Sequence, residues 1–96
     1  MDHTAENIGH IASALYAAFR TVRVVNDEVR QKHRFVVGVD GNEQTLTIAH
    51  LTLQHRDWSR LEGFAADAIA ALRRGAVEVA VKVDGVRIVI GKRSQP

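Results

Sequence analysis

The sequence predicts a small α+β fold in which two helices cover one face of a four-stranded antiparallel sheet. Two segments, 4–22 and 59–74, carry apolar residues at the spacing of one helix face. Each is followed by alternating apolar and polar residues around an Asp-Gly pair, which is typical of a β-hairpin. The element order is therefore αββαββ. It is equivalent to a circularly permuted ferredoxin-like two-layer sandwich.

An approximate duplication accompanies this order, because Val-x-Val-Asp-Gly occurs in both predicted hairpins. We assign αββ repeats to residues 4–54 and 57–91, within a single domain that spans 1–96, and we expect a disordered tail at 92–96. The composition is 46% hydrophobic and 25% charged, which is ordinary for a globular domain. Alanine- and arginine-rich usage is compatible with a GC-rich bacterial or phage source.

The compartment predicted from the sequence is the cytoplasm. The chain has no cysteine, so disulfides, thiolate nucleophiles and cysteine-ligated metals are excluded. Its first ten residues, MDHTAENIGH, lack the basic start of a signal peptide. No apolar run approaches the roughly 18 residues that a membrane span needs.

The first helix begins with Thr4 as its expected N-cap, and its apolar stripe runs through Ile8, Ile11, Ala12, Leu15, Phe19 and Val22. We place its end between Arg20 and Val24. The structure of 21–33 stays open, because the β-branched run TVRVV can extend the helix or begin a strand.

The first hairpin is predicted to turn at Asp40 to Glu43. That register places Phe35 opposite Ile48, Val37 opposite Leu46 and Val39 opposite Gln44.

The second helix carries a capping box, Ser59-Arg60-Leu61-Glu62, with Trp58 before it as a staple-like group or a contact residue. Gly75 is the expected residue beyond its C-terminus.

The second hairpin is predicted to turn at Asp84-Gly85. Val83 then faces Val86, Val81 faces Ile88, and Lys82 faces Arg87. Like charges opposed across two strands destabilise a hairpin by up to about 1 kcal/mol. Glu78 or solvation of splayed side chains offsets this in one interpretation. In the other, the two cations belong to a basic patch for phosphate or for an acidic partner surface.

Alternation assigns each strand residue to one face of the sheet. The face toward the helices is expected to hold Phe35, Val37, Val39, Leu46, Ile48, Val79, Val81, Val83, Val86, Ile88 and Ile90. The opposite, open face is expected to hold Arg34, Val36, Gly38, Thr45, Thr47, Ala49, Glu78, Ala80, Lys82, Arg87 and Val89. This open face is small and weakly apolar at its centre, which suits packing against a second copy or exposure to solvent.

Basic residues suggest an anion-binding or partner-binding surface. Segments 20–34 and 70–96 are basic, whereas 1–19 and 35–69 are acidic. The predicted open face has no aromatic residue, so the base-stacking platform of single-strand binders is missing. The proposed site residues are Arg30, Lys32, Arg34, Lys82, Arg87, Lys92 and Arg93.

No motif passes a geometric test for catalysis, and we predict no catalytic residue, cofactor or metal. The triplet His55-Arg56-Asp57 resembles a kinase catalytic loop, but a chain of 96 residues lacks the remaining kinase motifs. The predicted register places His33 opposite His50. This pair binds metal or senses pH if a third ligand approaches, and otherwise is two solvated histidines at the end of a hairpin.

Two functional hypotheses follow. The first is a non-enzymatic cytoplasmic interaction module that forms a homodimer and acts by occupying a protein partner, without membrane association. The alternative is binding of nucleic acid or another polyanion through the basic residues.

Overall fold

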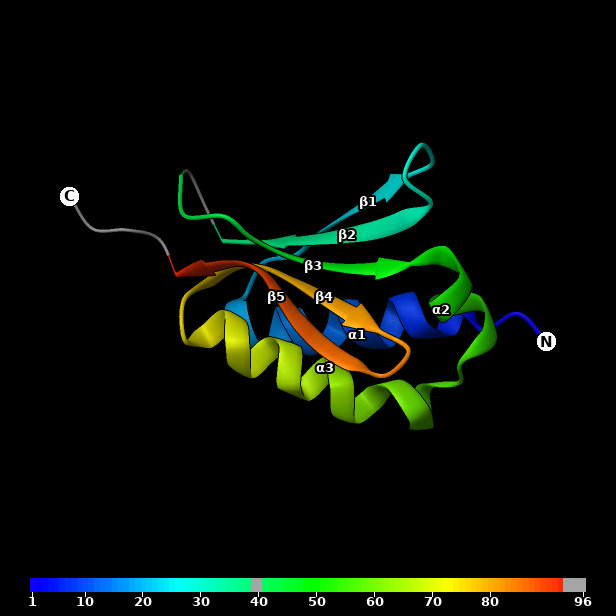
Figure 1. Ribbon diagram of the computed structural model, residues 1–96. Coiled ribbons are helices and arrows are strands. Elements are labelled where there is room, and N and C mark those ends of the chain that lie inside the picture. Colours follow the sequence, from blue (N-terminus) through cyan, green and yellow to red (C-terminus); the bar gives the residue numbers. More distant parts are fainter. Residues whose placement is uncertain (39–40, 93–96) are drawn as a thin grey trace.

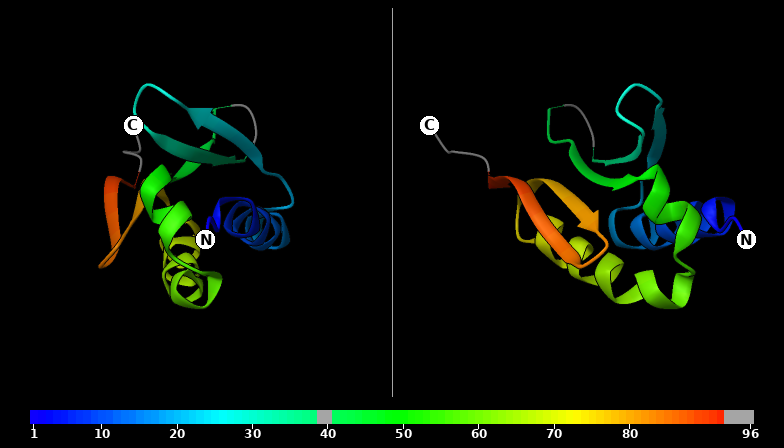
Figure 2. Two further views of the ribbon diagram at one scale, coloured as in Figure 1. Left: turned by 90° about the vertical axis from the view of Figure 1, so that its right-hand side faces the viewer. Right: turned by 45° about the vertical axis from the view of Figure 1, so that its right-hand side comes forward.

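One layer of the fold is a five-stranded mixed sheet, and the other is formed by helices packed on a single face of it (Figures 1 and 2). The computed structural model describes residues 1–38 and 41–92. None of the helices in these residues is long and apolar enough to cross a membrane. The elements in chain order are α1 (Thr4–Phe19), β1 (Arg23–Asp27), β2 (Lys32–Val37), β3 (Gln44–Ala49), α2 (His50–His55), α3 (Trp58–Arg73), β4 (Ala76–Lys82) and β5 (Gly85–Lys92).

The sheet differs from the predicted four-stranded antiparallel sheet in two respects. Its order is β1-β2-β3-β4-β5, and β1, formed by the run that the sequence left open, pairs antiparallel with β2. In addition, β3 and β4 are parallel. The helices α2 and α3 between them return the chain to the end of the sheet where β3 begins, so β4 runs in the same direction. The two hairpins therefore lie side by side, and the first half holds a strand and a short helix that the second half lacks.

The strand pairing of the first hairpin is shifted by two residues from the predicted register. Phe35 lies opposite Leu46, and Val37 lies opposite Gln44. Because β2 ends at Val37 and is followed by Gly38 at φ 96°, the connection is longer than a tight Asp-Gly turn. Val39 lies outside the described residues, so its predicted pairing is not described. A shift of two residues preserves the side-chain alternation, so the predicted inward face is retained.

The second hairpin shows the same two-residue shift. Val83 and Asp84 form the turn, and Lys82 pairs with Gly85, which has φ 146°. Arg87 consequently faces Ala80, so the predicted opposition of Lys82 and Arg87 is wrong. Glycine adopts this positive φ readily because it has no Cβ. Gly85 therefore lies just after the turn, and not within it as predicted. The like-charge pair therefore needs no compensating interaction.

The core lies between the helices and the inward face of β2, β3 and β4. The predicted inward residues Phe35, Val37, Leu46, Ile48, Val79 and Val81 are all buried, at 0–2% exposure. In contrast, Val83, Ile88 and Ile90 are about half exposed, at 55%, 53% and 50%. Val83 belongs to the turn. The two isoleucines belong to β5, which is an edge strand. The expectation that these residues face the helices fails for Val83, in the turn, and for Ile90, which pairs with Glu78 across a register irregularity. Ile88 pairs with the inward Val79 but is half exposed at the edge.

The N-cap residues of the two long helices are His3 and Asp57, not the predicted Thr4 and Ser59, and aspartate side chains bond to backbone N–H groups in both first turns. Asp2 Oδ1 accepts a hydrogen bond from the Thr4 N–H at 2.8 Å. Asp57 is the N-cap of α3 and accepts from the Arg60 N–H at 3.2 Å, while Ser59 Oγ donates to Asp57 Oδ1 at 2.7 Å. Carboxylates at these positions satisfy backbone donors and complement the helix dipole.

The remaining helix-end predictions agree with the structure to within one residue or become more specific. The first helix ends at Phe19, one residue before the predicted range, and its C-cap Arg20 lies in the left-handed region. Gly75 has φ 108° directly after α3, as predicted. Trp58 is partly buried and stacks on His10, with ring centroids 4.8 Å apart, so its ring covers the start of α3 instead of projecting freely.

Two buried or partly buried amides join distant elements. Asn7 of α1 is fully buried, and its Nδ2 donates to the backbone oxygens of Leu53 at 2.8 Å and Arg56 at 2.6 Å. Gln44 Nε2 likewise donates to the backbone oxygens of Leu72 and Ala76, at the end of α3 and the start of β4. The Asn7 bonds tie α1 to the end of α2, and the Gln44 bonds tie β3 to the α3–β4 connection, where the Leu72 oxygen also accepts from the Gly75 N–H.

Candidate functional site

The open face of the sheet has a floor of small, buried side chains at its centre. Arg34 pairs with Thr47, Thr47 pairs with Ala80, and Ala80 pairs with Arg87, so these four residues form one row across β2 to β5. Thr47 and Ala80 are only 4% and 5% exposed although no helix covers this face. Long side chains from the flanking strands surround them, because paired residues project from the same face of a sheet.

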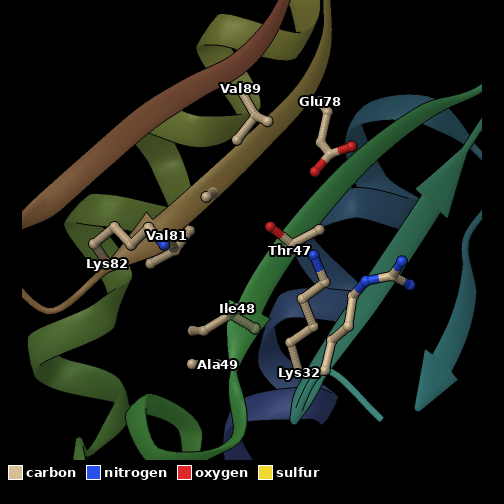
Figure 3. A pocket seen from close by; sticks show the side chains of 10 residues that line it. Lys32, Thr47, Ile48, Ala49, Glu78, Val81, Lys82 and Val89 are labelled. Carbon is tan, nitrogen blue, oxygen red and sulfur yellow. The ribbon is translucent and has the colours of Figure 1, made fainter. Parts of the chain in front are cut away.

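A pocket of about 330 Å³ opens over the junction of β3 and β4. We call it the seam pocket, because the strands on its two sides belong to the two hairpins (Figure 3). Its apolar wall is aliphatic, and its polar groups come from β2, the β1–β2 turn, β3 and β4. The lining residues are Arg30, Lys32, Thr47, Ile48, Ala49, Glu78, Ala80, Val81, Lys82 and Val89.

Charged groups of both signs enter the seam pocket. Figure 3 shows the Lys32 ammonium and the Glu78 carboxylate directed toward Thr47 from opposite sides. Within residues 1–38 and 41–92, no ion pair joins Lys32, Lys82 or Glu78 to a group of opposite charge. These groups are therefore available to a ligand.

Arg30 differs from the two lysines because it forms an ion pair with Asp27, whereas Lys32 lies opposite Asp27 across β1–β2 and interacts with it only through its charge. Its guanidinium lies 3.3 Å from Asp27 Oδ2, and its backbone N–H donates to Asp27 Oδ1 at 3.0 Å. The backbone hydrogen bond, followed by the side-chain hydrogen bond and charge of Arg30, lowers the pKa of Asp27 below its ordinary value. Asp27 thus remains ionised at neutral pH.

The structure brings together some of the predicted basic residues. Arg30, Lys32 and Lys82 line the seam pocket, and Arg34 and Arg87 occupy the row that crosses its floor. Lys92, predicted to begin a disordered tail, instead ends β5 and pairs with Ala76. Its aliphatic side chain lies over Gly75, where an added Cβ would come within 3.1 Å of Lys92 Cγ. Arg93 and the rest of the predicted tail, 94–96, lie outside the described residues.

Sequence reasoning did not select Thr47 and Glu78 as site residues. Both were assigned to the open face by strand alternation, which is the local signal that points to them. Their approach to Lys32 and Lys82 depends on the parallel pairing of Thr45 to Ile48 with Glu78 to Val81. The sequence prediction did not include that pairing.

The free edge of β5 is the second notable surface. The strand pairs with β4 on one side and has no neighbouring strand on the other among the described residues. Ile88, Val89 and Ile90 are 53%, 51% and 50% exposed, so consecutive β-branched side chains emerge on both faces of this edge. An eight-residue edge strand with apolar side chains is a template for pairing with another strand.

His33 and His50 are in contact, although not through the predicted pairing. His33 pairs with Ile48, and His50 is the first residue of α2, yet their ring centroids are 4.8 Å apart. His50 Nε2 lies 2.8 Å from Asn26 Oδ1, and His33 Nδ1 is buried without a hydrogen-bond partner. The described part of the chain contains no cluster of three metal-ligating side chains.

Acidification is expected to destabilise the fold through His33. Burial, and secondarily the nearby His50, lower the pKa of His33 below its ordinary 6.5, and Glu28 opposes this shift. The unfolded chain therefore binds a proton more readily, so stability falls as the pH drops through 6.5 toward the pKa of the folded state. Urea midpoints at several pH values between 7.5 and 5.5 measure the effect.

A His33→Gln variant is expected to lose less stability on acidification than the wild type. The exposed His55 supplies the matched control, because His55→Gln should retain the wild-type pH dependence. Identical slopes for His33→Gln and wild type would show that another group controls the transition.

The sheet thus offers two features that bear on function, the seam pocket on its open face and the free edge of β5. The first presents unpaired charges of both signs, and the second presents unpaired backbone groups beside apolar side chains. Comparison of the chain with protein-family models, with curated proteins and with solved structures found no match. Function is accordingly inferred from these two features.

Proposed function

We propose that this protein is a non-enzymatic interaction module that forms a homodimer by pairing the β5 edges of two copies. The observation that carries this proposal is the half-exposed run Ile88-Val89-Ile90 on an eight-residue edge strand. Natural edge strands are commonly protected by charge, proline or a bulge in the exposed part of the strand. This run has no charge or proline, and its one protective feature is an irregularity in the β4–β5 register between Glu78 and Val79, opposite Ile88 to Ile90. Half-exposed apolar side chains on such an edge favour contact over exposure to solvent.

A second copy suits the β5 edge because antiparallel pairing of identical strands forms a self-complementary twofold interface. If the twofold axis passes beside Val89, Ile88 lies opposite Ile90 of the second copy. Arg87 then lies opposite Gly91, and Lys92 lies opposite Val86. No like charges face each other directly in this register, so the strand's own charge pattern is compatible with self-pairing.

The first experiment is molar mass by light scattering across protein concentration, at low and high salt. A dimer at both salts is the expected result, because the interface is built from backbone hydrogen bonds and apolar contact. Val89→Lys should raise the dissociation constant on the order of 100-fold, since it places two lysines opposite each other at the axis.

Val24→Lys is the matched control. Val24 is 40% exposed on β1, the other edge of the sheet, so its replacement should leave the dimer intact. Circular dichroism confirms that each variant is folded. A wild-type protein that stays monomeric at every concentration rules out the proposal, and so does a dimer that Val24→Lys dissociates while Val89→Lys does not.

The alternative function is binding of nucleic acid or another polyanion, and one observation favours it. Three predicted cations line a single pocket and two more occupy its central row. Polyanion binding weakens steeply with added salt, because bound counterions are released from the phosphates. A monomer that carries nucleic acid at low salt and loses it at high salt would favour this alternative. A cytoplasmic location and a protein partner for the dimer remain predictions in either case.

A further inference from the structure

We propose that the seam pocket binds a small hydroxyl-bearing phosphate monoester of the sugar-phosphate class. The phosphate lies between Lys32 and Lys82, and the hydroxyl groups reach Glu78. This inference does not depend on the homodimer, because every lining residue belongs to one copy of the chain. It concerns the same cations as the polyanion alternative but assigns them a different ligand.

The cationic side of the seam pocket favours a compact anion. Lys32 and Lys82 enter one pocket and neither has an ion-pair partner among the described residues. A phosphate monoester carries nearly two negative charges at pH 7 and balances both ammonium groups. Thr47 adds a hydroxyl beside Lys32, as Figure 3 shows, and lysine with a hydroxyl group is a common combination around phosphate.

The acidic side of the seam pocket restricts the rest of the ligand. Glu78 is directed toward Thr47 from the side opposite Lys32, so the two charges border one space (Figure 3). An ionised carboxylate accepts hydrogen bonds from hydroxyl groups and repels a second phosphate. A ligand with one phosphate and neighbouring hydroxyls satisfies both sides, whereas a continuous phosphate backbone places negative charge against Glu78.

The size and wall of the seam pocket agree with this class. Its volume of about 330 Å³ is at the small end of ligand sites, which commonly span roughly 300–1,000 Å³. The wall is formed by aliphatic residues, and no aromatic residue lines the pocket. A nucleobase would therefore find no ring on which to stack, whereas the carbon face of a sugar can pack against Ala80 and Val89.

Isothermal titration with glucose 6-phosphate tests this assignment, with glucose, inorganic phosphate and a single-stranded oligonucleotide as comparison ligands. We expect saturable one-to-one binding of glucose 6-phosphate, weaker binding of phosphate, and no binding of glucose. Lys82→Gln should weaken the binding of glucose 6-phosphate about 10- to 100-fold through loss of one charge-assisted contact. Glu78→Gln should weaken the binding of glucose 6-phosphate and leave the binding of inorganic phosphate unchanged. It should strengthen the binding of the oligonucleotide.

Arg73→Gln is the matched control, because Arg73 is an exposed cation in the last turn of α3 and does not line the seam pocket. It removes the same charge and should leave glucose 6-phosphate binding unchanged. Circular dichroism and light scattering verify that each variant keeps the fold and mass of the wild type. Equal losses in Lys82→Gln and Arg73→Gln overturn the proposal, because they indicate attraction by net charge alone.

Two further outcomes also overturn the assignment. One is the absence of saturable glucose 6-phosphate binding up to about 10 mM. The other is tighter binding of the oligonucleotide than of glucose 6-phosphate by the wild-type protein, which would support the polyanion alternative instead.

Discussion

Replacement of Asn7 by alanine is expected to lower the free energy of unfolding by about 3 kcal/mol. Asn7 is fully buried, and its Nδ2 donates to two carbonyls, Leu53 O at 2.8 Å and Arg56 O at 2.6 Å. Alanine leaves the buried Leu53 oxygen and the partly buried Arg56 oxygen without this donor, and an unsatisfied buried group costs about 1–3 kcal/mol. It also removes the Asn7 Oδ1 atom, which is buried without a hydrogen-bond partner. The higher helix propensity of alanine offsets roughly 0.5 kcal/mol of this loss.

Urea denaturation at pH 7 measures the effect of Asn7→Ala as a lower midpoint with an unchanged slope. Ser13→Ala is the control, because Ser13 is exposed in the same helix and forms no hydrogen bond with another described side chain. Asn7→Asp should be more destabilising than Asn7→Ala, since it removes the donors and buries a charge beside carbonyl oxygens. A loss below about 1 kcal/mol in Asn7→Ala would mean that the C-terminal end of α2 finds other partners, such as water.

Gly38→Ala is expected to be similarly severe, at roughly 3 kcal/mol or more, because two effects add. Gly38 has φ 96°, where an L-residue is strained. A Cβ at this position would also lie 2.5 Å from the backbone oxygen of Asn42, so the backbone has to move. The change affects the point where the chain leaves β2, and thermal or urea unfolding reports it directly.

Gly63→Ala provides the opposite control. Gly63 lies within α3, and an added Cβ meets nothing within 4 Å. Alanine in a helix is favoured over glycine by up to about 1 kcal/mol, so Gly63→Ala should stabilise the protein. Equal midpoints for Gly38→Ala and wild type would show that the connection after β2 adopts another conformation in solution.

Much of the fold could be predicted from local patterns, because strand alternation and helix spacing depend on neighbouring residues. The inward face of β2 and β3 was predicted despite a wrong register, since a slip of two residues leaves each side chain on the same face. Phe35 is buried in either pairing. The register itself depends on how each turn closes, and Gly38 and Gly85 shift the turns from their expected positions.

The strand β1 and the parallel β3–β4 pairing were not predicted. The run TVRVV fits a helix or a strand locally, and its pairing with β2 decides between them. The pairing of Thr47 with Ala80 joins residues far apart in the sequence, and the seam pocket depends on it. The cations could therefore be named in advance, whereas their arrangement around Thr47 and Glu78 could not.

The burial of Asn7 could have been predicted from its position in the sequence, but it was not. It lies one helical turn before Ile11 and two before Leu15, and all three are buried. A polar residue in register with an apolar stripe indicates a buried hydrogen-bonding role.

The parallel pairing of β3 with β4 also determines how the chain folds. Hairpins close within about 1–10 μs, because their strands are adjacent in sequence. The β3–β4 pairing must wait until the crossover through α2 and α3 has ordered, since closing a long connection costs entropy before contacts compensate. We therefore expect the two hairpins to form before β3 pairs with β4. Until that pairing forms, the facing edges of β3 and β4 are free to pair with strands of other chains.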